Sequence, residues 1–199
     1  MTDKPFSQAC ENNKRPILAV LRQVFGRSGV VLEVGSGTGQ HGVFFAGQLP
    51  HLHWQPSDRA ENIPGMSLWF AEAGLANLLP PLVLDVTQDG WPAGRYQGVF
   101  TANTLHIMSW SEVEAMFAGL ARVLAPEAWV CIYGPFNYEG RFTSPSNRAF
   151  DAMLRSQNSR MGIRDIADVT ELAERHGLAL QADHAMPANN RLLVFQYHR

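Results

Sequence analysis

One glycine-rich stretch constrains the fold of this chain more than any other segment. It spans residues 30–42 and reads Val-Val-Leu-Glu-Val-Gly-Ser-Gly-Thr-Gly-Gln-His-Gly. An apolar run broken by one acid, followed by alternate glycines and a second apolar run, predicts a buried parallel strand that turns sharply into a helix. Glycines leave no Cβ in the way of a ligand, and the free N–H groups of the helix start point into the same space. We therefore expect a small-molecule site at the carboxyl end of the first strand of an α/β sheet.

Two registers of this loop indicate different ligands. Residues 37–42 match Gly-x-Gly-x-x-Gly, the fingerprint of dinucleotide-binding loops. The other register begins at Glu33 and has Gly35, Gly37 and Gly39 at alternate positions. A nearby carboxylate would repel a pyrophosphate, whereas it would attract a cofactor that carries an amino group and a sulfonium. Glu33 therefore favours S-adenosylmethionine over NAD, and a glycine turn that binds nothing is the remaining alternative.

Length and composition indicate one globular domain. A chain of 199 residues can bury a sizeable core, and a net charge of -2 gives no sign of a broad nucleic-acid or anionic-membrane footprint. The two cysteines, Cys10 and Cys131, imply no disulfide framework and fit a reducing cytoplasm. The first 15 residues contain no apolar segment typical of a signal peptide, and no run is long enough to span a bilayer. We expect a cytoplasmic monomer or homodimer that binds neither nucleic acid nor membrane.

Helical and strand patterns alternate along the chain, which predicts an open, doubly wound α/β sheet. Helices are expected at 14–25, 42–49, 63–79, after a capping box at Ser111-x-x-Glu114, after Ser144-Pro145, and from Asp165 to Gly177. Strands are expected at 30–34, 53–58, 82–86, 98–107 and 129–136, with a closing pair near 178–182 and 192–197. The polar residues 7–13 either fold over the glycine loop or form a frayed end.

Polar residues at the strand ends should face the same crevice as the glycine loop. Asp58 follows the loop by about 20 residues, the spacing of an acid that accepts hydrogen bonds from both ribose hydroxyls, with a helix N-cap as its competing role. Asp85 either faces an adenine amino group or is a plain surface acid. His106 ends the fourth strand and is the first candidate for a general base, because imidazole titrates near neutral pH. A histidine held by packing and one hydrogen bond is the alternative.

With Glu33-x-Gly35-x-Gly37-x-Gly39, Asp58, Asp85 and the strand end at 103–106, the chain resembles class I S-adenosylmethionine-dependent methyltransferases. It more narrowly resembles the uncharacterised domain-of-unknown-function family that includes the methyltransferase-like 26 proteins. That second resemblance lies in Asn13-Lys14-x-Pro16-Ile17-Leu18, the loop through His41, Gln55-Pro56-Ser57-Asp58, Asn103-Thr104-Leu105-His106-Ile107, Tyr133-Gly134-Pro135-Phe136, Ser144-Pro145-Ser146-Asn147, Gly162-Ile163-Arg164-Asp165 and Met186-Pro187-Ala188-Asn189-Asn190.

The resemblance implies a mostly parallel, seven-stranded Rossmann-like sheet with helices on both faces and its last strand antiparallel. It implies that the glycines lie beside the methionine part of the cofactor, Asp58 at the ribose, Asp85 near the adenine and Asn103 at the amino group. The full cofactor set is Glu33, Gly35, Ser36, Gly37, Gly39, His41, Asp58, Asp85, Val86 and Asn103. His106 and Tyr133 are the catalytic candidates, and Asn137, Asn189 and Asn190 are the substrate-binding candidates. Residues 1–27 should form an N-terminal lead-in and helix of the single domain 1–199, and the loop and helix at 134–165 should cover the site.

The expected function is methyl transfer from S-adenosylmethionine to an oxygen or nitrogen of a small molecule, which depends mainly on alignment and exclusion of water. An NAD(P)-dependent oxidoreductase and a catalytically silent S-adenosylmethionine-binding module are the alternatives. No metal is expected, because the only close histidine pair, His51-x-His53, fits a surface turn and no HExxH or CxxC motif occurs. Nucleic acid is disfavoured because no basic stripe accompanies the aromatic residues.

Overall fold

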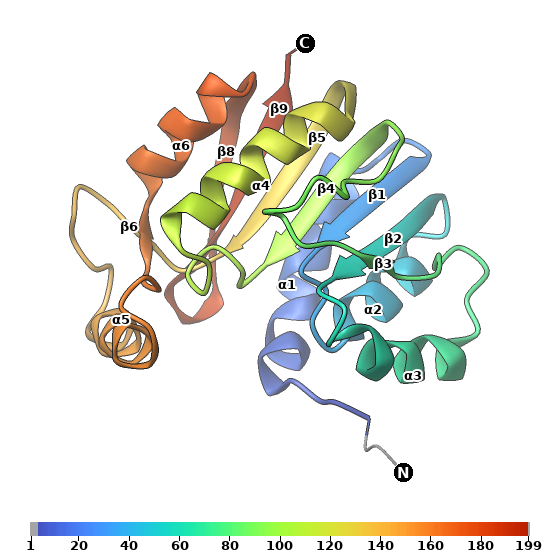
Figure 1. The fold of residues 1–199 in the computed structure, drawn as a ribbon, viewed down its shortest axis with the longest axis horizontal. Helices are drawn as coiled ribbons and strands as arrows, with labels where there is room; N and C mark the ends of the chain where they lie inside the picture. The colour runs from blue at the N-terminus through green and yellow to red at the C-terminus, as the bar shows by residue number, and fades with distance from the viewer. Residues whose placement is uncertain (1–3, 199) are drawn as a thin grey trace.

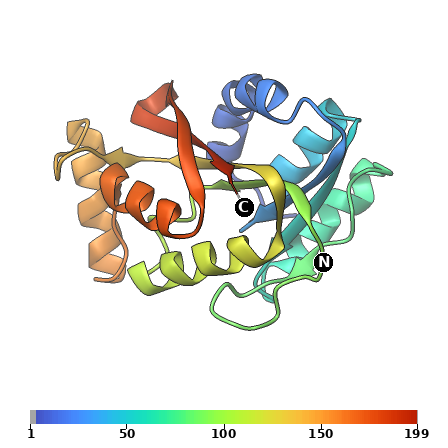
Figure 2. The same cartoon turned by 90° about the horizontal axis from the view of Figure 1, so that it is seen from above.

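The computed structural model describes residues 4–198, which form a central sheet with helices on both faces (Figures 1 and 2). Within these residues the main sheet has the strand order β3-β2-β1-β4-β5-β9-β8. The parallel strands are β1 (Gly29–Val34), β2 (Leu52–Asp58), β3 (Leu82–Val83), β4 (Tyr96–Ala102) and β5 (Leu124–Gly134). β9 (Asn190–Tyr197) lies antiparallel between β5 and β8 (Leu178–Met186). The predicted doubly wound sheet with an antiparallel last strand is confirmed.

The sheet separates two apolar cores. α1 (Gln8–Val24) and α2 (Gln40–Gln48) cover one face, α4 (Trp110–Val123) and α6 (Ile166–Arg175) cover the other, and α3 (Ile63–Ala73) packs beside α2. Neighbouring strand residues alternate between the cores: Val31 packs with α1 and α2, whereas Leu32 packs with α4. Because both faces are covered, β1, β4 and β5 are apolar along most of their length.

The N-terminal residues fold over the glycine loop. α1 begins at Gln8, six residues before the predicted start, and Ser7 is its N-cap. The Ser7 backbone N–H donates to Oε1 of Gln40 at the start of α2 (2.6 Å), and the Trp69 indole on α3 donates to the Pro5 carbonyl (2.7 Å). These contacts hold residues 5–7 across α2 and α3, so the polar lead-in is ordered rather than frayed.

The capping box of α4 was predicted two residues too late. The backbone N–H of Glu112 donates to Ser109 Oγ (3.3 Å), and the Glu112 carboxylate accepts from the Ser109 N–H (2.6 Å). The sequence contains Ser-x-x-Glu at 109–112 and again at 111–114, and the first copy is used because the preceding strand ends early. β4 stops at Ala102, where Asn103 adopts a left-handed φ of 59° and turns the chain.

The remaining elements lie beyond the carboxyl end of β5. α5 (Pro145–Gln157) begins after the N-cap Ser144, as predicted, and the short strands β6 (Phe136–Asn137) and β7 (Arg164–Asp165) pair outside the main sheet. A single 3₁₀ turn, η1 (Pro187–Asn189), joins β8 to β9. None of the helices within residues 4–198 combines the length and apolar character needed to cross a membrane.

Candidate functional site

A cavity of about 640 Å³ opens at the carboxyl ends of β1, β4 and β5. Its floor is formed by the glycine loop at 35–38 and by residues that end β4 and β5, including Ala102, Asn103 and Tyr133. Residues of α1 close one side, and residues of α5 and η1 close another. Parallel α/β sheets bind their ligands at this edge, so the cavity lies where the glycine loop predicted it.

The three alternate glycines of the loop have different structural roles. All of them have positive φ, 74° at Gly35, 56° at Gly37 and 85° at Gly39. A Cβ at Gly35 would lie 2.6 Å from the Thr104 methyl, and one at Gly39 would lie 2.8 Å from Cβ of Met66. A Cβ at Gly37 would have no atom within 4 Å. Packing therefore requires Gly35 and Gly39, whereas Gly37 borders open space at the cavity.

The end of β2 holds the loop in this shape. The backbone N–H groups of Gly35 and Ser36 both donate to the Ser57 carbonyl at 3.0 Å, and the Gly37 N–H donates to Oδ2 of Asp58 at 2.6 Å. The other carboxylate oxygen of Asp58 accepts from the side chain of Asn62 (2.8 Å). Asn62, not Asp58, is the N-cap of α3, so the competing N-cap role for Asp58 is wrong. Asp58 contacts Gly37 but is not itself among the residues that line the cavity.

Glu33 lies beneath the loop and not in the cavity. Its side chain is only 2% exposed, and Oε2 accepts a hydrogen bond of 2.8 Å from the Trp54 indole. Burial raises the pKa of this carboxyl to about 7, although hydrogen bonds from Trp54 and Ser36 act in the opposite direction. The alternation of strand residues directs Glu33 to the face covered by α2, which corrects the expectation that its carboxylate faces the ligand.

A polar network crosses the cavity wall from α1 to β5. His41 Nε2 lies 2.6 Å from Asn13 Oδ1, and its Nδ1 lies 3.9 Å from Cys10 Sγ. Burial lowers the pKa of His41 to about 4. Burial also raises the pKa of the Tyr133 hydroxyl, against hydrogen bonds from Asn13 and Asn190. These groups are therefore uncharged near neutral pH.

The imidazole of His106 is among the groups that line the cavity. Its ring packs edge-to-face on Phe150, with the ring centroids 5.2 Å apart. Neither ring nitrogen forms a hydrogen bond with any residue in the part of the chain that the structure describes. Burial lowers the pKa of His106 to about 4, with a smaller contribution from the charge of Arg164. A neutral imidazole with an unused lone pair can accept a hydrogen bond or a proton from a ligand.

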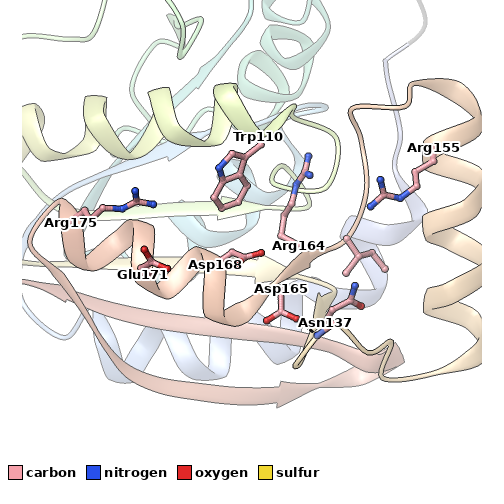
Figure 3. A pocket seen from close by; sticks show the side chains of 10 residues that line it. Trp110, Asn137, Arg155, Arg164, Asp165, Asp168, Glu171 and Arg175 are labelled. Atoms are coloured by element: carbon pink, nitrogen blue, oxygen red, sulfur yellow. Dashed lines mark hydrogen bonds between the residues drawn. The ribbon is translucent and has the colours of Figure 1, made fainter.

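The structure separates the three asparagines predicted to bind substrate. Asn190 lines the cavity, but Asn189 is exposed, and its carbonyl accepts from the Asn147 side chain at 3.2 Å. Asn137 borders a different pocket of about 550 Å³, where it lies near Asp165, and the lining of this pocket also includes Trp110 and charged residues (Figure 3). The pairing of β6 with β7 directs it there. Neither Asn189 nor Asn137 lines the cavity, so the expectation that they bind substrate there together with Asn190 is corrected.

Asp85 and Val86 also lie outside the cavity lining. Oδ1 of Asp85 accepts from the N–H and the hydroxyl of Thr87 at 2.9 and 2.7 Å, and these hydrogen bonds lower its pKa. Val86 is 8% exposed and belongs to the core under α4. The cavity therefore contains Gly35, Ser36, Gly37, His41 and Asn103 of the predicted cofactor set, together with both catalytic candidates, His106 and Tyr133.

Some cavity residues were missed from the sequence. Cys10 and Asn13 come from α1, and Asn147 and Phe150 come from α5. The polar run at 7–13, ahead of an amphipathic helix, was the one signal for the α1 residues. The helix that begins at Ser144-Pro145 was expected to turn Phe150 inward, but no local pattern indicated that Asn147 lines the site. Among residues 4–198, no three His, Cys, Asp or Glu side chains come together in a way that could hold a metal ion.

Comparison with known proteins gives a family and a fold. A family model described as "Protein of unknown function (DUF938)" matches residues 4–197. The S-adenosylmethionine-dependent methyltransferase SibL, in its apo form, is 23% identical with a TM-score of 0.79, over 96% of this chain and 56% of that chain.

Two other solved structures share the fold at lower identity. An O-methyltransferase family 2 protein from Planctomyces limnophilus, in complex with apigenin, is 15% identical with a TM-score of 0.81, over 94% of this chain and 57% of that one. Human N-acetylserotonin methyltransferase in complex with SAM is 12% identical with a TM-score of 0.82, over 96% of this chain and 53% of that chain. This chain thus spans little more than half the length of these proteins. They establish the Rossmann-like methyltransferase fold.

Proposed function

The chain belongs to the DUF938 family, and from its site we propose that it is an S-adenosylmethionine-dependent methyltransferase that acts on a small-molecule acceptor. The observation that carries the proposal is the open space at Gly37. This glycine has the left-handed conformation, its N–H is held by Asp58, and a Cβ there would meet no protein atom. Such a position leaves room for a ligand to approach the backbone closely.

The residues around this loop suit the chemistry of the cofactor. S-adenosylmethionine supplies the methyl group and carries a sulfonium, an amino group and a carboxylate. We propose that residues 35–37 and the backbone near Asn103 hold its methionine part, with His41 packed behind them. Asp58 is proposed for the ribose and Asp85 with Val86 for the adenine, on the outer side of the loop. Glu33 supports the loop from beneath through Trp54 and Ser36.

The catalytic roles are assigned to two uncharged side chains. We propose that His106 accepts the proton of a hydroxyl acceptor, because it lines the cavity and neither ring nitrogen has a hydrogen-bond partner among residues 4–198. Tyr133 positions the acceptor, since its hydroxyl is held between Asn13 and Asn190. Residues of α1 and of α5 line the cavity beside both groups, and we propose that a bound acceptor displaces water there and is aligned with the methyl group.

The comparisons support this proposal at the level of the fold. Solved structures that share the fold include methyltransferases described with SAM and with apigenin, a small molecule. We also propose a relation to the methyltransferase-like 26 proteins on the sequence stretches given above. Two free cysteines, Cys10 and Cys131, support the proposed cytoplasmic location, and we propose a monomer or a homodimer as the active form.

A pair of glycine substitutions tests the proposal. Gly37 and Gly74 have nearly the same φ, 56° and 59°, and neither has an atom within 4 Å of an added Cβ. Gly37→Ala and Gly74→Ala should therefore lose similar stability, on the order of 1 kcal/mol. Only Gly37→Ala should weaken binding of S-adenosylhomocysteine, by roughly tenfold or more, in calorimetric titrations. Equal affinity in the two variants, or binding of NADH in a parallel titration, would refute the proposed function.

A further inference from the structure

The cavity has an uncharged lining. Asp, Glu, Lys and Arg make up 17% of the chain, yet none of them is among the described residues that line the cavity. Four lining residues can titrate, namely Cys10, His41, His106 and Tyr133. Burial lowers the pKa of both histidines to about 4 and raises the pKa of the thiol and of the phenol, so all four are neutral near pH 7.

The charged side chains around the cavity interact with other residues of the protein. Glu11 on α1 forms an ion pair with Lys14 and accepts from Gln40 (2.8 Å). Arg164, which lies near His106, donates to the carbonyls of Leu105 and Met108. The Asp58 carboxylate accepts hydrogen bonds from the Gly37 N–H and the Asn62 side chain, and the Glu33 carboxylate accepts one from the Trp54 indole. Beyond the glycine loop, a charged acceptor would lose hydration and meet no charged side chain among the described residues that line the cavity.

The lining instead offers neutral hydrogen-bonding groups and apolar surface. The amides of Asn103 and Asn190 and the hydroxyls of Ser146 and Tyr133 can pair with hydroxyl or amide groups. Phe150, Pro135 and Ala188 contribute apolar surface to the lining. Phe150 packs against His106, so apolar surface adjoins the imidazole.

We propose that the methyl acceptor is an uncharged molecule with a ring-sized apolar body and hydroxyl or amide groups, not a carboxylate, a phosphate or an amine. This inference rests on the proposed function, because it treats the part of the cavity beyond the glycine loop as the acceptor site. It adds that the site selects its acceptor by the absence of charge.

Three probes with the same ring test the selection. We would titrate benzyl alcohol, benzylamine (a cation at pH 7) and benzoate into protein saturated with S-adenosylhomocysteine, and measure binding by ligand-observed NMR. Benzyl alcohol should bind roughly tenfold or more tightly than either ion. Saturation with S-adenosylhomocysteine tests the proposed function separately from the inference about the acceptor. Failure to bind S-adenosylhomocysteine refutes the proposed function, whereas saturation without a preference for benzyl alcohol refutes only this inference.

A matched pair of variants tests whether lining charge decides the preference. Ser146 is exposed, lines the cavity and lies in the first turn of α5, where a carboxylate is favoured, so Ser146→Asp should fold. Ser156 is exposed near the other end of the same helix and does not line the cavity. Ser146→Asp should raise the affinity for benzylamine severalfold relative to the affinity for benzyl alcohol, whereas Ser156→Asp should leave this ratio unchanged. Tight binding of an ion to the wild type, no binding of benzyl alcohol, or equal effects of the two variants would overturn the inference.

Discussion

Glu33 should make the protein less stable as the pH rises through neutrality. Its pKa is raised from 4.5 to about 7 because the carboxyl is buried beneath the glycine loop. The folded state therefore keeps a proton that the unfolded state has already released. The contribution of Glu33 to stability is fully present below pH 4.5, is lost as the pH rises from about 4.5 to 7, and is absent above that range. At about 1.4 kcal/mol for each pKa unit, the loss is about 3 kcal/mol.

Glu33→Gln isolates this effect. The glutamine side chain has nearly the same shape and keeps an oxygen that can accept from the Trp54 indole. The variant should match the wild type near pH 4.5 and exceed its stability by about 3 kcal/mol at pH 8, or by roughly 6–12 °C in Tm. Urea denaturation followed by tryptophan fluorescence at several pH values measures the difference. Glu114→Gln, on the exposed side of α4, is the control for removing one negative charge.

The two pH profiles decide the outcome. If Glu33→Gln and the wild type lose stability in parallel between pH 4.5 and 8, then the carboxyl does not hold its proton in the folded state. If Glu114→Gln reproduces the gain at pH 8, then net charge and not burial explains it. Either result would refute the reasoning from the burial of the Glu33 carboxyl.

Two further substitutions test the proposed roles of site residues. Asp58→Ala should abolish S-adenosylhomocysteine binding in calorimetry with an unchanged circular dichroism spectrum, while the exposed control Asp89→Ala binds normally; retained affinity would remove Asp58 from the cofactor site. His106→Ala should lower turnover more than S-adenosylhomocysteine affinity, whereas His53→Ala, at an exposed position on β2, should change neither; an unaltered rate would remove His106 from the mechanism.

The topology of this chain could be predicted because its signals are local. Apolar runs such as 30–34 and 129–136 are long enough to indicate buried strands, and glycines or prolines end most elements. Boundaries were less accurate where two signals compete. The repeated Ser-x-x-Glu pattern at 109–114 gives two possible helix starts, and only the early end of β4 at Ala102 selects the first.

Side-chain direction was harder to predict than position along the chain. Glu33 and Asn137 both lie next to strand ends, as expected, but Glu33 points to the face under α2 and Asn137 follows β6 into another pocket. In the same way, the hydrogen bond between His41 and Asn13 joins residues 28 positions apart. These contacts depend on how distant helices meet the sheet, and one sequence carries no direct signal for that.

Because Glu33 is buried, the attraction between its carboxylate and a sulfonium should depend on the pH, and this dependence can be measured. Near pH 7 the buried carboxyl is about half protonated, so its ability to attract a sulfonium depends on the pH. A cation above the loop would stabilise the ionised form, and linkage then requires cation binding to tighten as the pH rises toward about 8. S-adenosylhomocysteine has the same amino and carboxylate groups without the sulfonium charge. The ratio of S-adenosylmethionine to S-adenosylhomocysteine affinity should therefore increase severalfold between pH 6 and 8 in calorimetry. In Glu33→Gln the ratio should stay constant; a constant ratio in the wild type would mean that Glu33 supports the loop without sensing the charge of the donor.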